Sequence, residues 1–355
     1  MSEPTNSVLK RFRPGKILIP IAIGLISASY LLFKNFNVHA FDHVVWTNTS
    51  TVWILIAVLM LVVRDLAYMI RIRVLTDNKL SWRHSFDVIM LWEFASALVP
   101  PSLGGGFAFA IYILNKEKID LGKSIAVILF TSFLDGIFLL VMAIFSYYVA
   151  GRAELFGNLN IQLPGFLKSI INTQSIEYTF WVIFFLMAFY KLLVAYALFI
   201  NALSVGKLLN TIFSLPFLKR WKDDAAGTAN ELVIASRQLK GKSFVYWLKS
   251  LGSTFLSWTA RFLLINFIVM AFNPELSSHL VLFCKQVVIG MLNIASPTPG
   301  GSGTSELLFS EFFKNELGNN LGLAAALAVL WRLLSYYPYL FVGAFVLPRW
   351  IKRNF

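Results

Sequence analysis

The chain has 355 residues, of which 57% are hydrophobic, and a formal net charge of +13. Its long, uninterrupted apolar runs predict an all-α polytopic membrane protein and exclude a barrel of short alternating strands. We attribute the positive charge to cytoplasmic loops near anionic lipid and expect no binding of nucleic acid.

Eight apolar runs follow one another along the chain. They cover residues 17–33, 51–72, 86–115, 124–150, 179–201, 250–272, 280–317 and 320–347. The first follows Lys10-Arg11-Phe12-Arg13 without a strong cleavage signal, which indicates a retained helix. Basic residues before the first run and after the last one place both termini in the cytoplasm. The pattern predicts a multi-pass protein of the cell membrane, meaning the cytoplasmic or inner membrane.

Two of these runs are interrupted by a polar break rich in glycine. The run 86–115 breaks at Pro100–Gly106 and has basic residues on both sides, whereas the run 280–317 breaks at Pro297–Gly303 between weakly charged flanks. A simple crossing at 86–115 would put a basic cluster outside, which the distribution of positive charge in membrane proteins disfavours. We therefore predict two re-entrant hairpins, each made of two half-helices, that enter the membrane from opposite faces.

The remaining runs form six full spans, and the whole chain, 1–355, is predicted to be a single transmembrane domain. The first half covers about 17–150 and the second about 250–347, each with one hairpin. This arrangement is typical of inverted-topology repeats, in which paired broken segments point to a transporter's substrate site. Between the halves, the basic segment 203–249 is predicted to be helical and cytoplasmic, with its helix capped by Asp223 or Asp224.

Seven charged residues stand out deep inside predicted membrane segments, where each isolated central charge costs roughly 2.5–3.5 kcal/mol on insertion scales. They could pair with one another, for example Asp135 with Arg261 or Arg332, or reach the cytoplasmic surface in the case of Arg64 and Asp65. Because basic charge exceeds acidic charge at the centre, Arg261 and Arg332 are candidates for binding an anionic ligand. The seven are Arg64, Asp65, Glu93, Asp135, Lys191, Arg261 and Arg332.

The second break offers a candidate site for such a ligand. Its glycines let the backbone approach a ligand closely, and the N-terminus of the half-helix that follows favours phosphate or carboxylate. Glu306 in that half-helix either caps it or binds a cationic headgroup or a proton. No lysine follows the glycines as in a nucleotide-binding loop. The predicted substrate-binding residues are Pro299, Gly300, Gly301, Gly303, Thr304, Ser305, Glu306, Arg261, Arg332, Asp135, Gly104 and Gly105.

Other chemistry is not indicated. The single Cys284 excludes an internal disulfide framework and a cysteine zinc site, and the four histidines lack the spacing of metal ligands. No nucleophile–base pair is recognisable either. We therefore expect no metal, no cofactor and no enzymatic activity.

The stretch from Ser296 to Glu306 resembles the P-x-P-G-G-x-G-x-x-E signature of the lysylphosphatidylglycerol synthase transmembrane family, which is flippase-like. Ala325–Gly343, with Arg332 and Tyr336, resembles the closing helix of that family, and Ser124–Leu140 resembles an earlier helix. Leu98–Asn115 is similar to its first-half motif but lacks the basic residue that usually follows the glycines. The resemblance covers nearly the whole chain.

The resemblance implies movement of a phospholipid or another polar-headgroup lipid between leaflets. The family includes the membrane part of the multiple peptide resistance factor, and because this chain ends at Phe355 without a soluble synthase domain, we expect lipid transport and not synthesis. The headgroup phosphate would lie on Arg261, Arg332 and the amides of the second break. Glu306 and Asp135 would engage a cationic headgroup part or a coupling proton.

Membrane phospholipids are the expected partners, and a homodimer or an enzyme of lipid biosynthesis is left open as a further partner. Two alternatives to lipid transport also remain open. One is a secondary transporter of a small soluble anion. The other is an accessory subunit, or an embedded enzyme, of envelope lipid or glycan synthesis.

Overall fold

The computed structural model describes residues 46–103, 106–157, 159, 173–212, 222–273 and 279–354. All regular elements within these ranges are helical, which confirms the predicted all-α class. The helices are α3 (Asn48–Leu75), α4 (Trp82–Leu98), α5 (Phe107–Lys116), α6 (Leu121–Phe156), α8 (Thr173–Phe199), α9 (Ala202–Ile212), α10 (Lys222–Leu239), α11 (Phe244–Phe272), α12 (His279–Asn293), α13 (Thr304–Phe313), α14 (Leu321–Ser335) and α15 (Tyr337–Asn354). Two short 3-10 turns, η2 (Pro101–Leu103) and η4 (Pro299–Gly301), lie between them.

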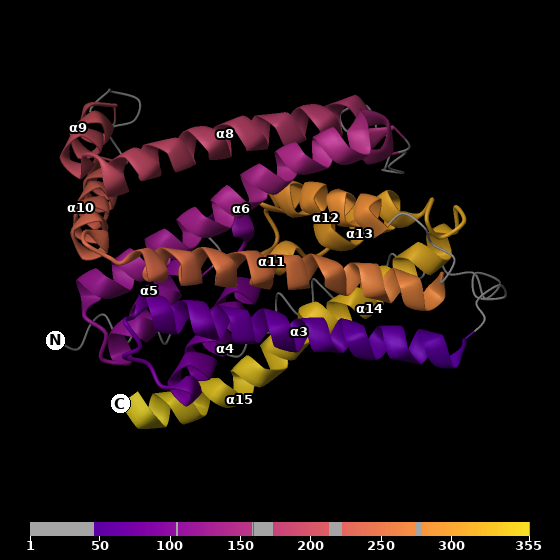
Figure 1. Ribbon diagram of the computed structural model, residues 1–355, viewed down its shortest axis with the longest axis horizontal. Helices are drawn as coiled ribbons and strands as arrows, with labels where there is room; N and C mark the ends of the chain where they lie inside the picture. The colour runs from indigo at the N-terminus through magenta and orange to yellow at the C-terminus, as the bar shows by residue number, and fades with distance from the viewer. Residues whose placement is uncertain are drawn as a thin grey trace.

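Five helical stretches in the described part are long and apolar enough to cross a membrane: α3, α6, α8, α11 and the stretch formed by α14 with α15. The protein is therefore a multi-pass membrane protein. Figure 1 shows the long helices lying along the long axis of the molecule, with α9 and α10 across one end of them. The predicted first span, 17–33, lies outside the described residues.

Short polar side chains set the start of several helices a few residues before the apolar runs begin. The hydroxyl of Thr47 accepts from the N–H of Ser50 at the start of α3, and Ser81, Asp120 and Ser243 cap α4, α6 and α11 in the same way. Each such cap satisfies one N–H that the helix itself leaves unpaired. The first turns of α3 and α4 are mostly polar, so hydropathy alone places these starts too late, whereas α11 begins with the apolar turn Phe244–Trp247 and the charged Lys249 delays its apolar run.

The two predicted breaks are present, and they lie beside each other. α4 packs against α5 across the first break, and α12 packs against α13 across the second. In the region between the breaks, the N–H of Ser102 donates to the carbonyl of Ser296 at 3.4 Å. In Figure 1, α4 and α5 lie towards one end of the long helices, and α12 and α13 lie towards the other.

The last apolar run, 320–347, is not one continuous helix as predicted. α14 ends at Ser335, Tyr336 leaves the helical conformation with φ −125° and ψ −57°, and α15 then begins. Pro338 explains the interruption, because proline has no N–H to donate to the carbonyl four residues earlier and its ring clashes with that carbonyl. The break places Tyr336 and Arg332 at the centre of the molecule.

The predicted cytoplasmic segment 203–249 contains α9 and α10, but its last residues were assigned wrongly. α11 begins at Phe244, so Phe244 to Lys249 belong to a spanning helix. The predicted helix cap was also wrong, because α10 begins at Lys222 and both Asp223 and Asp224 lie within its first turn.

A small apolar cluster joins the first half of the chain to the last. Phe94 and Ala97 of α4 pack with Tyr336 and Leu340 at the junction of α14 and α15. Gly343 makes the contact possible, because a Cβ atom there would lie only 2.4 Å from Cβ of Phe94. α4, α15 and the second break are thereby held around one central region.

Candidate functional site

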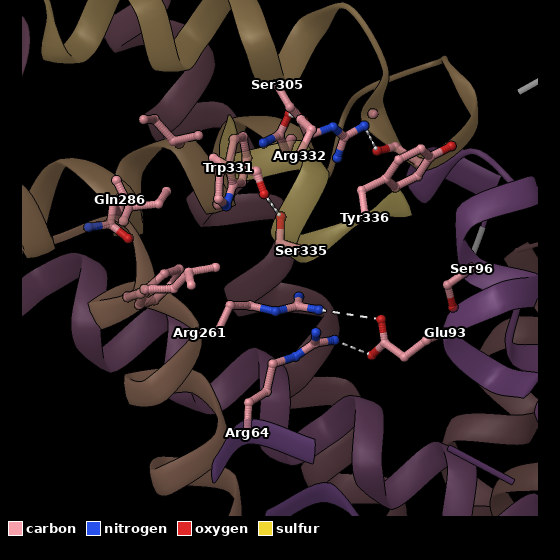
Figure 2. A pocket seen from close by; sticks show the side chains of 18 of the residues that line it. Arg64, Glu93, Ser96, Arg261, Gln286, Ser305, Trp331, Arg332, Ser335 and Tyr336 are labelled. Atoms are coloured by element: carbon pink, nitrogen blue, oxygen red, sulfur yellow. Dashed lines mark hydrogen bonds and ion pairs between the residues drawn. The ribbon is translucent and has the colours of Figure 1, made fainter. Parts of the chain in front are cut away.

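A cavity of about 310 Å³ lies where the two breaks meet. Residues of α3, α4, α11, α12, α13, α14, α15 and both 3-10 turns line it. Figure 2 shows three arginines and one glutamate around it, among aromatic and amide side chains. The four charged lining residues are Arg64, Glu93, Arg261 and Arg332.

Arg332 is held firmly by the second break. Its Nε donates to Oε1 of Glu306 at 2.9 Å, and its Nη2 donates to the carbonyl of Gly300 at 2.8 Å. The other carboxylate oxygen of Glu306 accepts from the N–H of Gly303 at 2.7 Å. Glu306 is 0% exposed, so it both caps α13 and neutralises Arg332. The glutamate that ends the P-x-P-G-G-x-G-x-x-E pattern is therefore the partner of Arg332. The backbone of the glycines in the same pattern holds both side chains in place.

Gly300 is required at its place by both conformation and space. Its φ is +57°, and a Cβ atom would lie 2.2 Å from the ring of Tyr336. The Tyr336 ring also stacks under the Arg332 guanidinium at 4.0 Å, and its hydroxyl donates to the carbonyl of Ala97 at 3.1 Å. Tyr336 therefore connects the second break to the end of α4.

A second charged group lies on the other side of the cavity. Glu93 is 2.5 Å from Nη2 of Arg64, which is itself buried and donates from Nη1 to the hydroxyl of Tyr339 at 2.6 Å. That hydroxyl donates in turn to Asp65. The Nη2 of Arg261 lies 3.7 Å from Glu93, too far for a hydrogen bond. Arg261 is the least restrained of the three arginines in the cavity, and 37% of its side chain is exposed.

An adjoining cavity of about 190 Å³ contains Asp135 and shares Glu93 and Arg261 with the first. Asp135 pairs with Arg71 at 2.5 Å and accepts from Nε1 of Trp258 at 2.7 Å. The pairing expected for Asp135, with Arg261 or Arg332, was therefore wrong. Arg71 lies at the end of the apolar run 51–72 and was not among the predicted site residues, but α3 continues to Leu75, beyond it. Its helical spacing from Arg64 and Tyr68 is the signal that could have placed it on the inner face.

The predicted excess of basic charge at the centre is not present. Each of the four central arginines has a carboxylate within 4 Å, in the pairs Arg64–Glu93, Arg71–Asp135, Arg261–Glu93 and Arg332–Glu306, and Asp65 lies 3.9 Å from Arg64. Lys191 lines neither cavity and donates to the carbonyl of Ser132 in α6. An anion that enters the cavity must therefore compete with a carboxylate for an arginine.

The predicted site residues fall into three groups. The first cavity is lined by Arg261, Gly300, Gly301, Ser305 and Arg332, and the second by Asp135 and again Arg261. Pro299, Gly303, Thr304 and Glu306 lie in or beside the second break without lining either cavity, and Gly104 and Gly105 lie outside the described residues.

Sequence reasoning missed several lining residues that carry no charge. Gln286 and Asn293 of α12 lie in an apolar run, and such isolated amides in a membrane segment are a usable signal of a polar interior. Trp258 and Tyr339 were overlooked because aromatic residues are frequent throughout the chain. Within the described ranges, no group of three histidine, cysteine, aspartate or glutamate side chains could hold a metal ion.

Comparison with known proteins agrees with the resemblance in the second break. Residues 17–343 match the family described as the lysylphosphatidylglycerol synthase TM region. The chain is also 22% identical, over 307 residues, to a UPF0104 membrane protein of Archaeoglobus fulgidus, in an alignment that covers 82% of this chain and 85% of that protein. No solved structure matches the chain. Since the family match includes both breaks and all four central arginines, this chain belongs to the family of the lysylphosphatidylglycerol synthase transmembrane region.

Proposed function

We propose that the protein is a lipid translocase that moves a polar-headgroup lipid, such as a phospholipid, between the two leaflets. The observation that carries this proposal is a charged cavity at the junction of two broken helices inside an otherwise apolar bundle. Ionisable residues at membrane depth are costly and mark the paths of polar substrates. Broken helices near the midplane build the substrate sites of many secondary transporters.

The proposal includes two re-entrant hairpins, α4–α5 and α12–α13, that belong to inverted repeats and enter from opposite faces. Helix length supports this, because α5 and α13, of 10 residues each, would span about 15 Å, half of the roughly 30 Å hydrocarbon core. The contact between Ser102 and Ser296 supports a meeting point of the two tips. In this arrangement both termini are cytoplasmic and the protein resides in the inner membrane.

The headgroup would lie in the cavity while the acyl chains remain in lipid. Arg332 is already engaged by Glu306 and Gly300, whereas Arg261 is more exposed and more loosely paired. We therefore assign the first contact with the phosphate to Arg261. Rocking of the two hairpins about this fixed site would open it to one leaflet and then to the other.

Leaflet exchange of phospholipids in proteoliposomes tests the proposal. Exchange should depend on the protein and fall at least tenfold in Arg261→Gln, because a phosphate would lose its charged partner. Arg152→Gln is the matched control, since Arg152 pairs with Glu177 at the exposed end of α6 and lines neither cavity. Equal exchange in liposomes with and without protein, for all phospholipids tested, would contradict the proposal.

A soluble-anion transporter is the second candidate. The size of the cavity favours it as much as a headgroup site, because about 310 Å³ holds a free phosphate-like anion without acyl chains. Uptake of inorganic phosphate by the same proteoliposomes, without lipid exchange, would support this candidate.

We also propose that the chain has no catalytic activity of its own, as a transporter or as an accessory subunit. Chemical turnover of a lipid by the purified protein would contradict this part of the proposal.

A further inference from the structure

One contact in the cavity resembles an interaction that a ligand would make. Glu93 binds the Arg64 guanidinium closely, at 2.5 Å, and approaches Arg261 only to 3.7 Å. Figure 2 shows its carboxylate facing both guanidinium groups, which lie next to each other and point towards it from α3 and α11. A carboxylate that faces two arginines occupies the position that a phosphate oxygen would take.

The neighbouring groups make this contact easier to exchange than the Arg332–Glu306 pair. Glu93 and Arg261 are both partly exposed, at 22% and 37% of their side chains. Arg64 has a further buried donor, Nε, without a hydrogen-bond partner among the described residues. Two arginines therefore offer more donor groups than the carboxylate of Glu93 uses.

We propose that Glu93 is a displaceable counter-ion, which the phosphate-like anion of the ligand replaces at Arg261. This inference rests on the proposed function and adds to it a residue that sets specificity and release. With Glu93 charged, an anion must overcome its repulsion to enter and is expelled readily afterwards. Neutralising Glu93 should therefore strengthen the binding of net-anionic ligands most, that of zwitterionic phospholipids less because their cationic group offsets part of the repulsion, and that of uncharged ligands hardly at all.

Equilibrium binding to the purified protein in nanodiscs tests the inference separately from transport. The probes are phosphatidic acid and phosphatidylcholine, each with the same fluorophore on an acyl chain, and inorganic phosphate as a competitor. Glu93→Gln should bind phosphatidic acid about tenfold more tightly than the wild type, since one repulsive charge a few ångströms away is removed. Arg261→Gln should bind it at least tenfold more weakly.

Asp87→Asn is the matched control for the loss of a carboxylate. Asp87 lies on α4 like Glu93, but it pairs with Arg353 and lines neither cavity. This variant should bind phosphatidic acid like the wild type. If inorganic phosphate also competes more strongly in Glu93→Gln, the site takes a free anion. If only the binding of phosphatidic acid becomes tighter, the effect belongs to a lipid headgroup. Both results support the inference.

A measurement on the wild type covers the case in which Glu93→Gln does not fold. Acidification neutralises carboxylates, so lowering the pH until Glu93 is protonated should strengthen the binding of fluorescent phosphatidylglycerol, whose phosphodiester keeps its charge, as the substitution does. Asp65→Asn and Asp135→Asn should retain this pH response if Glu93 is its source. The charged and titratable groups around Glu93 are Arg64, Asp65, Tyr68 and Arg71 of α3, Asp135 of α6, Arg261 of α11 and Tyr339 of α15.

The possible failures are distinguishable. Unchanged or weaker binding in folded Glu93→Gln, together with a loss in Arg261→Gln, overturns the role of Glu93 and leaves the proposed site intact. Binding that neither variant alters overturns both the counter-ion and the lipid site. A wild type that binds phosphatidylglycerol equally tightly before and after its carboxylates are protonated likewise overturns the inference.

Discussion

Two arginine–glutamate pairs in the central region have the same chemistry and opposite surroundings. Arg332 and Glu306 are 2.9 Å apart, and their side chains are 7% and 0% exposed. Arg261 and Glu93 are 3.7 Å apart and are partly open to the cavity. A buried pair fixed by backbone contacts costs much to separate, whereas a loose, wetter pair costs little. The first pair therefore builds the break, and the second is available for a ligand.

The largest expected effect is on the buried pair. Glu306→Ala should lower the free energy of unfolding by about 3–5 kcal/mol, because it leaves the Arg332 guanidinium buried without its counter-charge. Thermal unfolding in detergent measures this change. The double variant Glu306→Leu with Arg332→Met is the control and should recover most of the lost stability. A single variant as stable as the wild type would show that Arg332 reaches water.

A smaller effect is expected where the second break touches Tyr336. Gly300→Ala should cost on the order of 1–3 kcal/mol, because alanine is strained at a φ of +57° and its Cβ meets the tyrosine ring. Chemical unfolding measures the cost, and adding Tyr336→Ala should make the double variant more stable than the sum of the two single effects. Gly252→Ala in α11 is the control, since a Cβ there meets no atom within 4 Å.

For the Arg261–Glu93 pair, a substitution should change ligand binding strongly and the stability of the protein only slightly. Arg261→Gln should change the free energy of unfolding by less than about 1 kcal/mol, because the partly exposed pair is weak. The same variant should lose anion binding, which the titration with phosphatidic acid measures. A stability loss as large as that of Glu306→Ala would remove the distinction between the two pairs.

The smallest effect is expected for an ion pair outside the spans, which serves as a reference. Asp77 follows α3; burial alone would raise the pKa of its carboxyl, but hydrogen bonds from Lys242 and Lys123 outweigh burial and lower it. A pKa lowered on folding adds stability above the unfolded value, about 3.9, that is lost as the pH falls through the folded value. Wild-type stability below about pH 4 should therefore decline slightly more than that of Asp77→Asn in pH-dependent unfolding.

The sequence was sufficient for those features of the fold that follow from hydropathy. The apolar runs correctly indicated all-helical membrane architecture, and the glycines and prolines marked both interruptions, since such residues end helices by local chemistry. Helix starts were misplaced where Thr47 or Ser81 capped a mostly polar first turn. The interruption at Tyr336 was missed because it lies in an apolar run.

The site could be predicted only in part. The second break and Arg261 were found from residue type and position, and the family signature in the break was confirmed. Partners were not predictable, because Asp135 and Arg71 are 64 positions apart and meet only because α11 packs against both α3 and α6. The polar interior around Gln286 likewise depends on which face of α12 turns inward.

The hydrogen bond between Ser102 and Ser296 restricts how the molecule can open. If the breaks lie at membrane depth, as the proposed hairpins require, their separation would leave one backbone N–H and one carbonyl unpaired where lipid offers no substitute. Water must then reach the midplane, or the breaks must travel together as one body. Each separation of the two breaks would in that case let water into the centre of the molecule. The permeability of the protein to water would therefore report the separation even in the absence of any substrate.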